Sequence, residues 1–181
     1  MVVAWSGGCA GSGDAAIGVR SGLTAVTAGG LAAYVYSTDV TSSEPLSLLV
    51  ATFLLGVLTA NFAAVLNTVL RPFFSGLGAI GMGLFFFTVV GPVEEAVKLL
   101  AVRLYAYTDS RFDAVLDGAV YGAMAGLGFA VIENALYITR QLPATELDFG
   151  LGLIGVGGGI TAIRALAGPG HVIYSAIAGY Y

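Results

Sequence analysis

Seven ionisable side chains lie within or beside long apolar stretches of the 181-residue chain. An Asp, Glu, Lys or Arg at the centre of a membrane span costs about 2.5 to 3.5 kcal/mol on insertion scales. Such groups must therefore face one another, a metal ion or water, and several acids with one imidazole can transfer protons or bind a metal. The residues that we take as a candidate functional site are Glu94, Glu95, Lys98, Asp117, Glu133, Arg164 and His171.

The segment GPVEEAVK, residues 91–98, carries two adjacent acids directly after an apolar run. Glu94 precedes Lys98 by four residues, which is the favourable order for an ion pair on a helix. Glu95 lies about 100° around the helix from Glu94. We therefore predict that Glu94 pairs with Lys98 and that Glu95 points elsewhere. An acidic first turn after Pro92 at a membrane interface is the simpler alternative, but the further buried acids of the chain make it the weaker one.

Glycines at four-residue steps mark one face of a predicted helix over residues 112–139. Gly118, Gly122 and Gly126 follow the small-xxx-small pattern that lets two membrane helices approach closely. Phe129 and Glu133 fall within about 40° of this stripe when the helical wheel is continued. Glu133 should therefore project from the face that packs against another helix and away from lipid.

Three further polar residues could have a structural or a functional role. Asn134 follows Glu133, and its amide could hold a substrate peptide or make an interhelical hydrogen bond, which we rate as equally favoured. Asp117 lies near the start of its helix, and we predict that it pairs with Lys98 or an arginine. Arg164 is expected to neutralise a buried acid.

His171 is the only histidine of the chain. It follows the segment GPG, and Ser175 lies one helical turn later on the same face. Among several intramembrane carboxylates, a single imidazole can serve as a metal ligand, a proton shuttle or an oxyanion donor. We therefore include His171 among the candidate catalytic residues, with Ser175 and Asn134 as candidate substrate or oxyanion contacts.

The composition decides what kind of protein positions these residues. Hydrophobic residues make up 57% of the chain and charged residues 10%, against roughly 25% charged residues in soluble domains. The mean hydropathy is +0.91. We predict an all-α, polytopic transmembrane helix bundle embedded in a lipid bilayer. The net charge of -4 and the pI near 4.7 argue against nucleic acid as a partner.

Apolar runs predict about six helices within a transmembrane domain over residues 21–181, preceded by a disordered lead over 1–20. The segment GPGH should separate the fifth helix from the sixth. The sixth would stop after about ten residues, too few to cross a bilayer, so we expect the chain to be truncated after Tyr181. The predicted helices are 21–36, 46–70, 77–90 continuing after Pro92 to about 107, 112–139, 147–167, and a last one starting near 171.

Three segments in this order resemble the PrsW family of intramembrane proteases: EEAVK, FDAVLDGAVYGAMAGLGFAVIENALY and RALAGPGHVIYSAIAGYY. The resemblance covers residues 45–181, and the family belongs with the CAAX prenyl endopeptidases and bacteriocin-processing proteins. It implies cleavage of a peptide bond in a membrane protein substrate, as in regulatory cleavage of anti-sigma factors. It also implies that Glu94 and Glu95 are catalytic. Glu133 stands where the superfamily's second motif has His, and Ser175 stands where its third motif, matched by His171, has an Asn-type partner.

Two hydrolytic mechanisms are compatible with these residues. In one, zinc is held by Glu133, His171 and either Glu94 or Glu95, of which we prefer Glu95, and the remaining glutamate is the base. In the other, no metal binds, and the carboxylates and the imidazole activate water directly. A small proton-coupled transporter and a non-catalytic membrane scaffold are the alternative functions, because intramembrane acids also occur in transporters.

Overall fold

The computed structural model describes residues 12–38, 44–141 and 160–181. Over these residues the fold is all-α, as predicted, and no strand is present. The helices are α1 Ser12–Ser37, α2 Leu46–Leu70, α3 Pro72–Ser75, α4 Gly78–Phe85, α5 Gly91–Leu104, α6 Val115–Gln141 and α7 Ile160–Tyr180, with a π-helical segment η1 at Phe86–Val90 and a 3-10 turn η2 at Ala106–Thr108.

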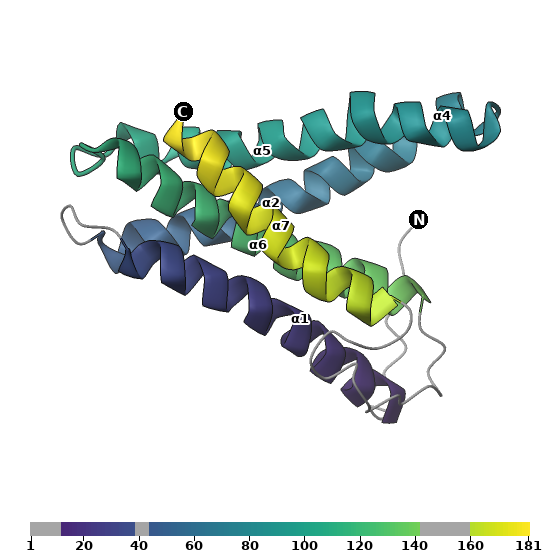
Figure 1. Cartoon of the computed structure of the whole chain (residues 1–181), viewed down its shortest axis with the longest axis horizontal. Helices are drawn as coiled ribbons and strands as arrows, with labels where there is room; N and C mark the ends of the chain where they lie inside the picture. Colours follow the sequence, from purple (N-terminus) through teal and green to yellow (C-terminus); the bar gives the residue numbers. More distant parts are fainter. Residues whose placement is uncertain (1–11, 39–43, 142–159) are drawn as a thin grey trace.

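Helix α6 is the central element of the bundle. It packs against α7, α2, α1 and α5, and its contact with α7 is the most extensive in the molecule. Figure 1 shows α7 crossing in front of α6 and α2 crossing behind it, with α1 along one flank and α5 on the other. The α4 and α5 segments follow one another along a line, and α4 lies at the outer end of that line, where its main contacts are with α3 and η1.

Two helices among the described residues are long and apolar enough to cross a membrane. They are Leu46–Leu70, with a mean hydropathy of 2.2, and Val115–Tyr137, with a mean hydropathy of 1.7. Helix α2 presents a continuous apolar face outward, which is the arrangement expected of a helix in contact with lipid. The exposed residues of this face follow steps of three or four and are Leu54, Leu58, Phe62, Val65 and Val69.

The glycine stripe of α6 is in backbone contact with α7, which confirms the predicted packing face. A Cβ atom added at Gly122 would collide with the carbonyl oxygen of Ser175, and one at Gly126 would collide with that of His171. Gly118 faces Gly179 in the same way. This close approach fixes the height of His171 along α6, because no side chain separates the two backbones.

Helix α7 continues through the segment in which we predicted a break. Pro169 lies inside the helix, and Gly168 and Gly170 flank it without ending it. Membrane helices tolerate proline because neighbouring helices and local adjustment satisfy the freed carbonyl. The predicted separate helices over 147–167 and from 171 are therefore one helix where the chain is described, and residues 147–159 lie outside the described part. His171 consequently lies within a helix and does not begin one.

Helix α1 begins at Ser12, within the stretch that we assigned to a disordered lead. Residues 12–20 therefore belong to α1 and not to a disordered lead. Residues 1–11 lie outside the described part of the chain.

A π-helical segment joins α4 to α5. The N–H of Gly91 donates to the carbonyl of Phe86, five residues earlier, in place of the usual four. Pro92 follows in the first turn of α5, where its missing N–H costs nothing. The prediction that Pro92 kinks the chain or opens a helix is thus confirmed in its second form.

We expect Gly122→Ala to destabilise the fold by about 1 to 3 kcal/mol, because the added methyl must displace the backbone of α7. Gly83→Ala is the matched control, since nothing lies within 4 Å of its Cβ position in α4. Thermal unfolding of the purified chain in detergent, followed by circular dichroism, measures both variants. Equal unfolding temperatures for the two would contradict the close α6–α7 contact.

Candidate active site

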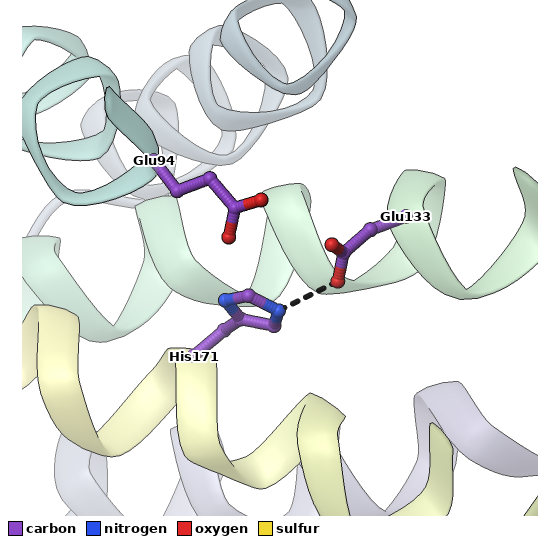
Figure 2. Close-up of side chains that lie close together, drawn as sticks. All are labelled: Glu94, Glu133 and His171. Atoms are coloured by element: carbon purple, nitrogen blue, oxygen red, sulfur yellow. Dashed lines mark hydrogen bonds and ion pairs between the residues drawn. The ribbon is translucent and has the colours of Figure 1, made fainter. Parts of the chain in front are cut away.

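Three ionisable side chains from α5, α6 and α7 converge at the centre of the bundle. They are Glu94, Glu133 and His171, and one potential ligand atom from each lies within 4.8 Å of the other two. His171 Nε2 lies 2.7 Å from Glu133 Oε2. Figure 2 shows the carboxylate of Glu94 directed toward the gap that the other two residues border. Residues far apart in the chain thus form one cluster.

Glu133 is held in place by a buried arginine. Arg164 Nη2 donates to Glu133 Oε2, and Arg164 Nε donates to Asn134 Oδ1 at 2.7 Å. Asn134 Nδ2 donates in return to the Arg164 carbonyl, and the guanidinium lies 4.6 Å from the centre of the Tyr137 ring. Asn134 is fully buried. Of its two readings, the interhelical hydrogen bond is therefore the one that the structure contains.

Lys98 pairs with Glu95 and not, as predicted, with Glu94. Lys98 Nζ lies 2.6 Å from Glu95 Oε1 and 3.0 Å from His171 Nδ1. The ammonium also lies 4.8 Å from the centre of the Phe129 ring. Steps of three and of four residues both bring side chains together on a helix, and here the ring of His171 attracts the ammonium to the side of Glu95. Lys98 is 1% exposed, whereas Glu95 is 36% exposed.

This pairing changes which glutamate belongs to the cluster. Glu95, our preferred metal ligand, is bound to Lys98 and is not one of the three converging groups. Glu94 occupies that place. The first of the two acids is therefore directed to the site, and the second neutralises the lysine.

The contacts of Lys98 assign the protonation of the His171 ring. A lysine ammonium only donates hydrogen bonds, so His171 Nδ1 must accept, and the ring hydrogen resides on Nε2 and points at Glu133. The ring also lies against Phe129, with 5.1 Å between ring centres. Lys98, Glu133 and Phe129 together orient the imidazole.

A cavity of about 280 Å³ opens beside Glu94 and Glu133. Asn67 of α2 lines it and donates through Nδ2 to Glu94 Oε1 at 3.4 Å. Our reading of the sequence missed Asn67, whose signal was an amide in the otherwise apolar span of α2. The cavity is large enough for water and for part of a peptide. Apolar side chains also line it, among them Met82, Phe85, Phe86 and Val90.

Two predicted residues lie away from this cavity. Ser175 is buried at the α6–α7 contact beside Gly126, and its hydroxyl has no hydrogen-bond partner among the described residues. Asp117 Oδ2 accepts from the backbone N–H groups of Asp113 and Ala114, each at 2.8 Å. The described contacts of Lys98 are elsewhere, and these two bonds of Asp117 secure the start of α6.

Comparison with known proteins identifies the family of the chain. The sequence profile of the PrsW family intramembrane metalloproteases matches residues 44–181. The chain belongs to the PrsW family. It is 30% identical over 148 residues to the protease PrsW of Clostridioides difficile, which covers 82% of the chain and 58% of that relative.

Two further PrsW relatives show a similar degree of likeness. Identity is 34% over 110 residues to the protease PrsW of Bacillus subtilis, covering 60% of the chain and 48% of the relative. It is 32% over 151 residues to that of Geobacillus kaustophilus, covering 83% and 60%. The chain thus spans about half the length of the curated relatives it matches. No solved structure matches the chain.

Because PrsW proteins are described as metalloproteases, the cluster can be tested as a metal site. Two carboxylates and one imidazole supply three donors with a shared gap between them, as in catalytic zinc sites, which leave the fourth position to water. The set is rich in oxygen, which zinc accepts. The donors fit a divalent cation, but Nε2 of His171 could ligate it only if the ring hydrogen moved to Nδ1, which would end the present bonds to both Glu133 and Lys98.

The geometry predicts that zinc binding depends on Glu94 and not on Glu95. We expect Glu94→Gln and His171→Ala to abolish stoichiometric zinc in the purified chain, because each removes one of three ligands. Glu95→Gln is the matched control and should retain the metal. Elemental analysis by mass spectrometry measures the content, and loss of zinc in Glu95→Gln alone would contradict the assignment.

Proposed function

We propose that this chain is an intramembrane endopeptidase that hydrolyses a peptide bond of a membrane protein substrate. The observation that carries the proposal is the convergence of Glu94, Glu133 and His171 beside a cavity in an apolar bundle. Membership of the PrsW family supports it. The transporter and scaffold readings explain neither the three converging groups nor the family.

Hydrolysis begins with a water molecule between the two carboxylates. Glu94 is the general base and accepts a proton from this water, while Glu133 accepts the other hydrogen as a hydrogen bond and orients the oxygen. Glu133 can fill this role because Arg164 and His171 fix its position. The water oxygen then forms a bond to the carbonyl carbon of the substrate, and the carbonyl electron pair moves to its oxygen.

The tetrahedral intermediate needs a donor for its oxyanion and a proton for the leaving amine. The Arg164 guanidinium has further N–H groups and supports the oxyanion role while it still donates to Glu133, whereas the single Nε2–H of His171 takes this role only by leaving Glu133. Glu94 returns its proton to the amine nitrogen as the C–N bond breaks. Lys98 and Asn134 act as positioning residues, because they hold His171 and Arg164 and do not reach the reacting atoms.

Zinc, when bound by Glu94, Glu133 and His171, would supply a more acidic water and a polarised carbonyl. The metal-free mechanism uses the same two carboxylates, those of Glu94 and Glu133. Sensitivity to chelators therefore distinguishes the two mechanisms of the proposed enzyme.

The substrates that we propose are single-span membrane proteins, including regulators similar to anti-sigma factors. The proposed location is the cell membrane, with a multi-pass arrangement in which α2 and α6 are joined by further crossing helices. The apolar wall of the cavity suits the side chains of a membrane-embedded segment. Cleavage of such a segment would release the parts of the substrate on either side.

We expect Glu94→Gln and His171→Ala to lower kcat for cleavage of single-span peptides by about 10² to 10⁴-fold, as is typical when a general acid or base is removed. Asp113→Asn is the control, because Asp113 is an exposed acid at the start of α6, outside the cavity. Reconstituted chain in nanodiscs and mass spectrometry of the products measure the rates. Full activity of both site variants would refute the site.

Chelation gives a separate prediction about the mechanism. If zinc is required, treatment with a strong chelator abolishes cleavage, and added zinc restores it in the wild type but not in His171→Ala. If the metal-free mechanism operates, the rate is unchanged by the chelator. Cleavage assays before and after dialysis against the chelator distinguish the two.

A further inference from the structure

Asn67 of α2 is the polar group nearest to Glu94 that the proposed mechanism does not use. Its amide Nδ2 approaches Glu94 Oε1 at 3.4 Å, and its side chain lines the cavity together with Glu133. It lies near the end of a helix that otherwise contributes apolar surface to the bundle. An amide in this position can make further hydrogen bonds besides the one that orients the carboxylate of Glu94.

Most of the hydrogen-bonding capacity of Asn67 is unused among the described residues. Its Oδ1 is buried and has no partner among the residues that the structure describes. The amide nitrogen carries two hydrogens, of which one points to Glu94. A buried acceptor without a partner carries a free-energy cost, which a bound group that donates to it would remove.

Two nearby polar side chains of α2 behave differently, although Thr52 Oγ1 of the same helix is, like Asn67 Oδ1, buried without a partner among the described residues. Asn61 Nδ2 donates to the carbonyl of Val57, and Thr68 Oγ1 donates to that of Ala64, so both are satisfied within their own helix. The Asn67 side chain instead reaches across to α5. The chain therefore offers Asn61, an exposed asparagine on the same helix, as an internal comparison.

The proposed reaction creates a need for such an amide. A substrate helix must unwind locally before its peptide bond can be attacked, and each N–H or C=O freed in an apolar setting must find a partner. An asparagine side chain has the donor and acceptor of a peptide group, so it can replace one lost backbone pairing. The side chains of Met82 and Phe85, which also line the cavity, supply no such partner, whereas Thr68, Arg71 and Tyr137 are the other polar residues of the lining besides the two glutamates.

We propose that Asn67 is a substrate-binding residue, whose Oδ1 accepts a backbone N–H of the unwound substrate next to the bond that Glu94 and Glu133 attack. The inference rests on the proposed function, since it requires a peptide in the cavity. The proposed ligand of Asn67 is an extended peptide backbone. An alternative role, in which Asn67 only orients Glu94, predicts a different response to changes in the substrate.

The test uses a single-span probe peptide of about 20 leucine and alanine residues with a central Gly-Gly pair. A series of analogues replaces one backbone N–H at a time around this pair with an ester oxygen. Binding to the chain in nanodiscs is measured by fluorescence in the His171→Ala background, and cleavage in the otherwise wild-type chain. Asn67→Leu keeps the branched shape of the side chain, with a larger volume, and removes both polar atoms, and Asn61→Leu is the matched control.

We expect one ester position to weaken binding about tenfold in the background chain and in Asn61→Leu, the effect of about one hydrogen bond. In Asn67→Leu, the amide peptide and this ester should bind equally. The inference would be overturned if every ester weakened binding equally in Asn67→Leu and Asn61→Leu. It would also be overturned if Asn67→Leu slowed cleavage of the amide and ester peptides by the same factor. Absence of cleavage together with the expected binding pattern would refute the proposed protease and leave the peptide-binding role of Asn67 standing.

Discussion

Charge compensation between three helices is the interaction on which the rest of the structure depends. A buried ion is tolerated only when a partner of opposite charge and further hydrogen bonds replace its lost hydration. Here the network joins α5 to α7 and α7 to α6. Removal of any of these three helices would leave a buried charge without its partner. Removal of one partner of a buried pair typically costs about 3 to 5 kcal/mol. The interactions that orient the candidate catalytic groups are therefore also those that secure the assembly, and they join Glu95, Lys98, His171, Glu133, Arg164 and Asn134.

The glycine contact between α6 and α7 supplies the precision that this network needs. Ionic groups on long side chains tolerate some error in helix position, whereas a bond from the short imidazole of His171 to Glu133 does not. Contact between the backbones at Gly122 and Gly126 leaves α7 a single height and distance relative to α6. Helix α2 then closes the other side of α6, where Gly128 faces the carbonyl of Phe53.

Much of this arrangement could be predicted from the sequence, and the errors have a common cause. The bounds of α2, the glycine stripe and the inward direction of Glu133 follow from composition and helical periodicity, which are local properties. The choice between Glu94 and Glu95 depends on where His171 lies, and that is a tertiary contact that no spacing within α5 reveals. The break expected at Pro169 failed for a similar reason, since packing against neighbours outweighs the preference of one residue. Asn67 was overlooked because a single amide does not alter the pattern of an apolar span.

The π-helical segment before α5 has a consequence for how this architecture can vary. A π turn is equivalent to one extra residue in an α-helix, and each residue rotates the helix by about 100°. The segment at Phe86–Val90 therefore sets the rotational phase of α4 independently of Glu94. Deletion of one residue there would turn Phe85 away from the cavity wall and leave the carboxylate where it is. Insertions or deletions at this joint could therefore change the shape of the cavity in related proteins without moving the carboxylate of Glu94.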